Sequence, residues 1–454
     1  MNTTAHNIAN VNTPGFSRQN AHIETNMPIG DGNVVLGQGS SVRSVKRMHS
    51  EFVQSKMQDG LSHAQYFEDR YHFLEGLENI FNEISQGGFH LTINEFFNNF
   101  KDLANRPEND TVRSLVREGA KNVIKEIQNA NKSLNENIKH IDRISEQTIK
   151  DVNSLMETIS KQNVQIKILE SMHGETGDLR DQRDLAVDEL SKFMGLTTYK
   201  DENDNLVVNA KGVGTLISGG KYSELSVGYS EFLGVDSLEI IFNGQNISHK
   251  FSSGGLKAID EIKKVEIKNL KEKIDEIAYH LVNSVNAIHK RGFSHLNGTE
   301  GNPRTGIAFF KEPLEKFRAS EYLDLSEEVK NDINNIVSAL KPFSPGDNRV
   351  ALAISKLKEV PMIKNPGQEG KRTLEEDFLQ TIGALSLQTN KSKINYEQAQ
   401  GVLAQTKNIK ERISGVSLDE ETAKMVQLQH AYDASAKMLK VADEMLNAIL
   451  ELKR

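Results

Sequence analysis

One stretch of the chain, from Ala120 to His173, contains neither glycine nor proline, the two residues that most strongly interrupt helices. Its apolar residues recur at helical spacing, as in Val123, Ile127 and Leu134. At about 1.5 Å per residue, such a helix would form a rod of about 80 Å. Helices of this length usually lie in antiparallel bundles or coiled coils. The stretch therefore predicts a mainly α protein built on a long antiparallel helical bundle.

A different sequence pattern begins after Gly195, where short runs of alternating apolar residues are separated by turn residues. The run Leu238–Phe242 leads directly into Asn243-Gly244, which is a strong hairpin signal. We interpret Thr197 to about Ser253 as an all-β domain inserted between helical segments. Helical periodicity then resumes.

The region from Gly301 to Pro345 is harder to assign. Ala308–Phe310 and Tyr322–Leu325 are expected to be strands that return to the β domain. The sequence thus predicts nested, discontinuous domains whose two ends meet in space. These are terminal assembly segments at 1–30 and 416–454, a long-helix bundle domain at 31–194, 256–300 and 346–415, and a β-rich outer domain at 195–255 with 301–345.

Composition excludes several functional classes. The net charge of −8 argues against nonspecific nucleic-acid binding, because such binding needs a basic surface. The absence of cysteine removes disulfides, thiolate nucleophiles and thiolate metal sites. No apolar run approaches the length of a membrane span, and Met1–Asn10 lacks the pattern of a secretory signal. We therefore expect a cytoplasmic protein, or one that leaves the cell by a route needing no such signal.

Two segments resemble ligand loops without meeting their requirements. In the segment Gly214 to Lys221, Thr215 stands where a phosphate loop needs glycine and Tyr222 replaces its Ser or Thr, so a glycine-rich hairpin is favoured. In the segment Asp201, Asn203 and Asn205, which mimics the start of a calcium loop, Leu206 occupies the position of the required glycine. A β-turn is favoured there.

No other constellation points to catalysis. The thirteen histidines include no His-Glu-x-x-His, and His289 and His295 are interpreted as polar positions near a helix end. We expect no catalytic residues, no cofactor and no metal site, and hence no enzyme.

The charged run from Asp178 to Asp188 alternates acids and arginines. As a helix it would place Arg180 one turn from Asp184, which is attractive, and Asp184 one turn from Asp188, which is repulsive. The repulsion suggests that a cation from another helix or subunit lies nearby.

The C-terminal segment carries the strongest periodic signal. Its apolar and small residues alternate in steps of three and four, which is the spacing of a coiled-coil seam. Ser417 before Leu418, with Glu420 three residues on, forms a capping-box pattern that fixes the start of this helix. A long apolar stripe in water favours a partner over a helix packed on its own domain. The predicted assembly seam is Leu418, Met425, Leu428, Tyr432, Ser435, Leu439, Ala442, Leu446 and Ile449.

The N-terminal segment is different in character. A short stretch with apolar Ile8 and Val11 stops at Pro14-Gly15, which predicts a type II turn because proline fixes its φ and glycine accepts a positive φ.

Together, the two ends resemble the rod, hook and hook-associated proteins of the bacterial flagellum. The run from His6 to Phe16 is similar to the N-terminal signature of that family, and Ser414–Glu421, Gln429–Lys437 and Ala442–Leu446 are similar to its C-terminal end. The N-terminal residues concerned are Asn7, Ile8, Ala9, Asn10, Asn12, Thr13, Pro14 and Gly15.

Three interior motifs narrow the resemblance to the hook-associated members of that family, which join hook to filament. These motifs are Asp178–Asp184, Asn286–His289 and Pro345–Asn348. Members carry about five further turns of apolar helix before the Asn-Thr-Thr stretch, so we expect this chain to be N-terminally truncated relative to them. That helix would pack against the C-terminal seam.

The resemblance implies a self-assembling structural subunit at the hook–filament junction, outside the cell. Its expected partners are copies of itself in an axial ring, the hook protein, the next hook-associated protein, and a cytoplasmic export chaperone at the C-terminal helix. The family is exported unfolded through the flagellar type III pathway. Two alternatives stay open: another flagellar axial protein of the distal rod or hook, and a secreted coiled-coil adhesin or effector with a β head.

Overall fold

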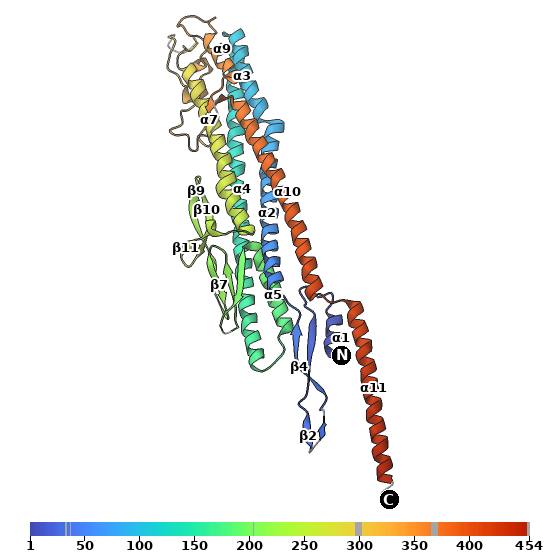
Figure 1. The fold of residues 1–454 in the computed structure, drawn as a ribbon. Coiled ribbons are helices and arrows are strands. Elements are labelled where there is room, and N and C mark those ends of the chain that lie inside the picture. The colour runs from blue at the N-terminus through green and yellow to red at the C-terminus, as the bar shows by residue number, and fades with distance from the viewer. Residues whose placement is uncertain (32–33, 37, 203, 296–301, 365–370, 452–454) are drawn as a thin grey trace.

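Long helices run side by side along one axis and give most of the chain the shape of a rod (Figure 1). The computed structural model describes all residues except 32–33, 37, 203, 296–301, 365–370 and 452–454. The α-helices of the described chain are α1 (Asn2–Ala9), α2 (Glu51–Gly87), α3 (Phe89–Asn105), α4 (Asp110–Ser171), α5 (Gly177–Phe193), α6 (Gly255–Glu261), α7 (Lys268–His289), α8 (Glu327–Asn331), α9 (Arg349–Ser355), α10 (Leu374–Ser414) and α11 (Leu418–Glu451).

The strands are short and lie in small antiparallel sheets. They are β1 (Gln19–Thr25), β2 (Ile29–Asp31), β3 (Val34–Leu36), β4 (Ser40–Arg47), β5 (Leu196–Lys200), β6 (Leu206–Ala210), β7 (Gly214–Ser218), β8 (Lys221–Tyr222), β9 (Ser226–Phe232), β10 (Val235–Phe242), β11 (Gln245–Asn246), β12 (Ile363–Lys364) and β13 (Lys371–Arg372). The structure is therefore mainly α with a β insertion, as the sequence predicts.

The predicted long helix is confirmed as α4, and it starts ten residues earlier than expected. Asn109 caps it, because its side chain accepts a hydrogen bond from the Val112 backbone N–H at 3.2 Å. The helix runs through Gly119, where α3 comes so close that an added Cβ would lie 2.6 Å from Asn99 Nδ2. With 62 residues, α4 extends for about 93 Å.

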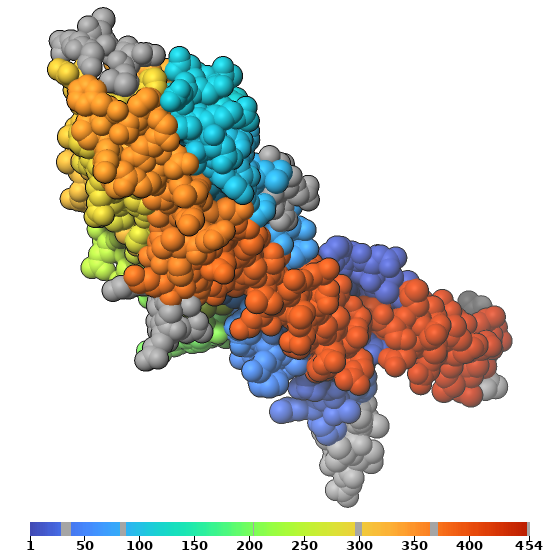
Figure 2. Space-filling model, turned by 90° about the horizontal axis from the view of Figure 1, so that it is seen from above, coloured from blue at the N-terminus to red at the C-terminus, as the bar shows by residue number. Residues whose placement is uncertain are grey.

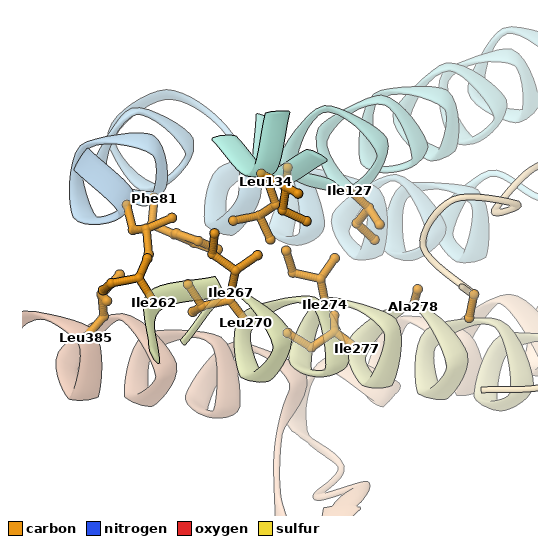
Figure 3. Close-up of a cluster of buried hydrophobic side chains, with 14 of the residues drawn as sticks. Phe81, Ile127, Leu134, Ile262, Ile267, Leu270, Ile274, Ile277, Ala278 and Leu385 are labelled. Atoms are coloured by element: carbon orange, nitrogen blue, oxygen red, sulfur yellow. The ribbon is translucent and has the colours of Figure 1, made fainter. Parts of the chain in front are cut away.

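The core of the rod is built from helices that are far apart in the sequence. Figure 3 shows Phe81 of α2, Leu134 of α4, Leu270 of α7 and Leu385 of α10 meeting between these helices. α2 and α10 pack along each other, so the N-terminal and C-terminal parts of the chain form one bundle. A π-helical turn, η2 (Ile262–Ile267), joins α6 to α7 within this bundle.

The β insertion lies between α5 and α6 and contains two sheets, with strand orders β5-β6-β7-β8 and β11-β10-β9. The predicted Asn243-Gly244 hairpin is confirmed, because both residues have positive φ and Phe242 pairs with Gln245. The sheets are held to α4. Asn163 Nδ2 donates to the Gly219 carbonyl at 2.9 Å, and the buried Lys263 Nζ donates to Asp142 Oδ1 at 2.9 Å and the Leu238 carbonyl at 2.6 Å.

The two ligand-like loops are turns, as the sequence favours. The run Gly214 to Lys221 is the β7–β8 hairpin, in which Ser218 pairs with Lys221 and Gly219 has φ +57°. Asp201 lies at the β5–β6 turn, where its Oδ1 accepts a hydrogen bond from the Asn205 backbone N–H at 2.8 Å. Asn203 lies outside the described residues.

The structure differs from the predicted strands between Gly301 and Pro345. Within the described part of this region, Phe310 and Leu325 form a single isolated bridge rather than strands of the β domain. Phe309 packs instead against Phe96 and Phe100 of α3, with ring centroids 5.8 and 5.4 Å apart. Burial of these aromatic side chains in the rod outweighs their local strand propensity.

His289 lies at the C-terminal end of α7, as expected, but it belongs to the core and is not an ordinary polar position. It is fully buried, and its Nε2 accepts a hydrogen bond from the Val337 backbone N–H at 2.9 Å. Nδ1 therefore carries the proton and donates to the Ile307 carbonyl at 2.8 Å. Burial lowers the pKa of His289 to about 4, so the neutral imidazole ties two irregular segments to α7.

The predicted boundary at residue 30 falls inside a two-stranded ribbon. β1 pairs with β4 from Gln19–Arg47 to Thr25–Ser40, and β2 pairs with β3 beyond them. This ribbon extends from the end of the rod where α1 and α11 also leave it (Figure 1). The described strands of this ribbon therefore leave the rod together with α1 and α11.

Candidate assembly site at the chain termini

The C-terminal helix α11 projects away from the rod and contacts the rest of the chain only near its start (Figure 1). Glu421 is its one buried residue among those described. The outer part of the predicted seam is open to solvent: Tyr432 is 63%, Leu439 73%, Leu446 59% and Ile449 63% exposed. Of the other seam residues, Leu418, Ser435 and Ala442 are exposed, and Met425 and Leu428 are half-buried.

The apolar surface of α11 is wider than the predicted seam. Met438 and Met445 are 71% and 64% exposed, and at 100° per residue they lie beside the Ser435–Ala442–Ile449 row. A seam of two positions per heptad suits one partner helix, whereas three positions suit the interior of a bundle. The outer half of α11 therefore offers an apolar face to more than one helix. The seven-residue repeat alone did not reveal this, although both methionines lie at helical spacing from it.

The N-terminal motif forms the joint between α1, β1 and α11. Asn7 is 1% exposed, and its Nδ2 donates to the Gln19 carbonyl at 2.9 Å and to Glu421 Oε2 at 3.2 Å. The Gln19 backbone N–H donates to Asn7 Oδ1 at 3.0 Å. One buried amide side chain of α1 thus satisfies groups of two other segments, β1 and α11. Ile8 is half-buried, and Ala9, Asn12, Thr13 and Pro14 are exposed.

The turn that follows has the predicted type II geometry. The Phe16 backbone N–H donates to the Thr13 carbonyl at 3.2 Å, and Gly15 has φ +80°. Asn10 steadies the turn, since its Oδ1 accepts from Thr13 Oγ1 at 3.1 Å and its Nδ2 donates to the His6 carbonyl at 3.0 Å. Gly15 packs closely on Leu185 of α5.

Arg18 joins the two ends of the chain. Its guanidinium lies 2.7 Å from Glu421 Oε1 and 2.9 Å from Glu420 Oε2. Burial alone would lower the pKa of Arg18, but the two carboxylates outweigh it and raise that pKa. The Arg18 backbone N–H also donates to the Ser414 carbonyl, the last residue of α10, at 2.8 Å.

One face of α5 holds this joint to the rod. It presents acids at helical spacing, and each has a partner on another element. Asp178 Oδ1 accepts from Gln19 Nε2 at 2.7 Å, Asp181 Oδ2 accepts from the Ser17 backbone N–H at 2.7 Å, Asp184 lies 2.7 Å from Arg47 Nη1, and Asp188 lies 3.2 Å from Lys410 Nζ. Burial raises the pKa of Asp188 to about 6, despite the nearby Lys410.

The predicted ladder within α5 is only partly correct. The external cations expected from the Asp184–Asp188 repulsion are confirmed as Arg47 of β4 and Lys410 of α10. Arg180, however, pairs with Glu170 and Asp204 rather than with Asp184. Asp178, Asp181 and Asp184 bind residues of the N-terminal segment, and Asp188 binds Lys410 of α10. These tertiary partners, in a more buried setting, outweigh the expected intrahelical pair of Arg180 with Asp184.

No group of three or more metal-ligating side chains comes together in the described part of the chain. Within the same residues, no helix is long and apolar enough to cross a membrane.

Comparison with known proteins agrees with this arrangement. The family model described as the helical domain of flagellar hook-associated protein FlgK matches residues 74–310. The model described as the C-terminal region of flagellar basal body rod FlgEFG proteins matches residues 412–452, the segment that contains α11.

Related proteins match along nearly the whole chain. Flagellar hook-associated protein 1 of Bacillus subtilis is 25% identical, over 99% of this chain and 94% of the relative. The protein of the same name from Salmonella typhimurium is 18% identical, over 100% of this chain and 97% of the relative.

The fold has a counterpart among solved structures. The flagellar hook junction protein FlgK from Burkholderia pseudomallei matches with a TM-score of 0.67 at 13% identity, covering 79% of this chain and 100% of that one. The helical-domain model alone spans more than half of the residues of this chain, which assigns the chain to that family. The chain belongs to the flagellar hook-associated protein FlgK family, the structural proteins of the hook–filament junction.

Proposed function

We propose that this chain joins hook to filament as one subunit of an axial ring, and that copies assemble through the apolar face of α11. The observation that carries the proposal is the exposure of that face in the single chain. Tyr432, Leu439, Leu446 and Ile449 are each more than half exposed on one helix. Burying each of them would contribute roughly 1 kcal/mol or more, so covering α11 gives a substantial driving force for assembly.

The terminal joint supports the proposal because it directs this surface. Asn7, Arg18 and Glu421 fix the start of α11 against α1 and β1 before any partner is present. A helix anchored at one end loses less orientational freedom on association than a free helix does. The Asn7–Gly15 motif therefore holds the base of α11 in a fixed orientation.

Family membership places the chain in the flagellum, outside the cell, and implies self-assembly with hook components. We further propose that its neighbours are the hook protein, the next hook-associated protein and its own copies. In the cytoplasm, an export chaperone would cover the exposed face of α11, and the chain would leave by the flagellar type III pathway.

We propose that the assembled chain is arranged in three layers. The terminal segments at 1–30 and 416–454, extended to Arg47 by the ribbon, form the inner core. The helical bundle surrounds that core, and the β insertion at 195–255 lies outside. The position of the β insertion on α4, away from α11, supports this order (Figure 1).

A pair of charge substitutions on α11 tests the proposed function. Leu439→Asp places a carboxylate in the seam, whereas Asn447→Asp adds the same charge about 100° around the helix from Leu446. Both positions are exposed, so both variants should keep the unfolding temperature of the native chain. Leu439→Asp should be missing from purified hook–filament junctions while Asn447→Asp is incorporated. Equal incorporation of the two variants would rule out the seam as the assembly surface.

A further inference from the structure

Two methionines, Met438 and Met445, expose their thioether side chains on the outer half of α11. They are 71% and 64% exposed. Seven residues separate them, so they lie about two turns apart on the same side of the helix. Figure 2 shows α11 standing clear of the rod beyond its base, so solvent reaches this part of the helix in the single chain.

Both methionines flank the predicted seam. At 100° per residue, Met438 lies about 40° around the helix from Ala442 and about 60° from Ser435. Met445 has the same relation to Ile449 and Ala442. Side chains at this angle from a seam contact the partner helix that covers the seam. The two thioethers are therefore open in the single chain and become covered when α11 is covered.

Thioether sulfur is the part of this chain that reacts most readily with peroxides. The chain has no cysteine and no tryptophan, so its eleven methionines hold all of its sulfur. A hydroperoxide transfers one oxygen to the sulfur: an S–O bond forms, the O–O bond breaks, and the reduced oxidant leaves as an alcohol, or as water from hydrogen peroxide. Access of the oxidant to the sulfur sets the rate, so Met438 and Met445 should react well before the fully buried Met156 and Met194.

Oxidation at these two positions changes the chemistry of the seam. The sulfoxide is polar and accepts hydrogen bonds, whereas the thioether is apolar. The positions one turn away from Met438 and Met445 hold alanine, valine, isoleucine and Ser435. The Ser435 hydroxyl already donates to the Ala431 carbonyl at 2.8 Å. A sulfoxide covered by an apolar partner would thus lose its water without a donor from these positions, which disfavours burial.

We propose that Met438 and Met445 form an oxidation site that determines whether a free subunit can assemble. The inference rests on the proposed function, because it requires the seam of α11 to be covered in the junction. In the free subunit, a hydroperoxide converts the two thioethers to sulfoxides, and the oxidised face of α11 binds partner helices weakly. In the junction the same side chains are covered and the oxidant no longer reaches them. Oxidation therefore acts on subunits that have not yet been incorporated.

The modification is reversible. Methionine sulfoxide reductases, one for each sulfoxide epimer, return the sulfoxide to the thioether. Two thiols are oxidised to a disulfide in this step, and the oxygen leaves as water. Because the chain has no cysteine, the thiols come from the reductase and its reductant. An oxidised subunit can therefore be returned to its assembling form without being replaced.

Peroxide treatment of the purified chain tests the reactivity of the two sulfurs. After brief exposure to hydrogen peroxide, mass spectrometry should find sulfoxide at Met438 and Met445, and also at the exposed Met27 and Met172. Met156, which is fully buried, should stay reduced over the same time. Equal rates of oxidation at Met156 and at the two methionines of α11 would overturn the proposal.

Binding to isolated hooks tests the consequence for assembly. The oxidised native chain should join hooks at least about tenfold less than the untreated chain, the effect of about 1.4 kcal/mol. The double variant Met438→Leu with Met445→Leu keeps apolar side chains of similar volume, so it should join hooks equally before and after peroxide. The matched control is Met27→Leu with Met172→Leu, which removes two exposed methionines outside α11 and should stay as sensitive to peroxide as the native chain.

The outcomes separate the two proposals. Failure of the untreated native chain to join hooks would contradict the proposed function. Undiminished joining by the oxidised native chain would overturn only the oxidation site. Loss of joining by the peroxide-treated α11 leucine variant, or protection by the control substitutions at Met27 and Met172, would also overturn it.

Enzymatic reduction gives an independent test that uses the native chain alone. The oxidised chain is treated with both methionine sulfoxide reductases and dithiothreitol until mass spectrometry finds Met438 and Met445 reduced. Joining to hooks should then return to the level of the untreated chain. Joining that stays low after both sulfurs have been reduced would overturn the oxidation site.

Discussion

Arg18 donates from Nε to the fully buried carboxylate of Glu421 at 2.8 Å, although the two residues are 403 positions apart. This ion pair closes the chain on itself where the rod, the ribbon and α11 meet. The residues next to Arg18 and Glu421 in the sequence give no indication that the two form an ion pair. The pair makes the start of α11 part of the folded subunit, whereas the outer part of that helix is exposed.

Removing the buried charge should loosen this joint. Glu421→Gln is expected to lower the free energy that holds α1, β1 and the start of α11 together by about 2 kcal/mol. This is less than the roughly 3–5 kcal/mol expected for a fully buried ion pair, because the Arg18 side chain is about a quarter exposed. Amide hydrogen exchange in α1 and the first turn of α11 should accelerate about thirtyfold. Glu420→Gln is the control, since that side chain is 64% exposed and should change exchange little. Matching behaviour of the two variants would contradict the role of Glu421.

Beyond the joint, α11 should be weakly protected in the free subunit. From Ala423 to Leu450 the helix is largely exposed, and an amphipathic helix without its partner cannot offset its ordering entropy. Hydrogen exchange should therefore be fast there in the monomer and slow in assembled junctions. Strong protection of this segment in the monomer would overturn the expectation.

Acid should destabilise the rod through His289. Its pKa is about 4 in the folded chain and about 6.5 when unfolded, so the unfolded state binds the proton first. The stability that the neutral imidazole contributes is present above pH 6.5 and is lost as the pH falls from 6.5 to 4. The total loss is about 3 kcal/mol.

The matched variant for this prediction is His289→Gln, which can still accept from Val337 and donate to Ile307 but does not titrate. The difference in unfolding free energy between native chain and variant, measured by urea titration, should shrink as the pH falls. A difference that stays constant between pH 7 and 4 would disprove the prediction. Because other carboxyl and imidazole groups titrate in both proteins, only this difference is informative.

The β insertion should depend on Lys263 for its attachment to α4. Lys263→Met removes the ammonium group from the Leu238 carbonyl and from the buried Asp142 carboxylate, which keeps its hydrogen bond from Ser237 Oγ at 3.3 Å. The loss should cost about 3 kcal/mol in the free energy of unfolding. Adding Asp142→Asn should recover part of that loss, because the uncompensated charge is removed. A double-mutant cycle measures the recovery, and strictly additive losses would exclude the coupling.

The sequence predicted those parts of the fold that depend on short-range patterns. α4 follows from a long stretch without glycine or proline, and the β10–β11 hairpin follows from Asn243-Gly244. The region around Phe309 was misassigned because its environment comes from α3, about two hundred residues away. The burial of His289 was missed for the same reason, since its partners Ile307 and Val337 lie in irregular segments that carry no periodic signal.

The candidate site was predictable in part. The heptad repeat predicts a seam on α11. Within the described residues its outer part is exposed, and no other helix packs along it. The partners of the α5 acids could only be inferred as cations of unknown origin. Arg47 and Lys410 reach Asp184 and Asp188 through tertiary packing, which residue spacing along one helix does not encode.

The contacts around Glu421 also fix the direction in which the long helix α11 leaves the rod. α11 has 34 residues and extends for about 51 Å, so a rotation of about 10° at its base would displace its tip by about 9 Å. A sideways shift of that size is close to the diameter of a helix, about 10 Å, and would carry Leu446 away from its contact on a neighbour. In the proposed assembly, where α11 is ordered along its whole length, the polar cluster of Asn7, Arg18 and Glu421 would therefore set where the far end of α11 meets a neighbouring subunit.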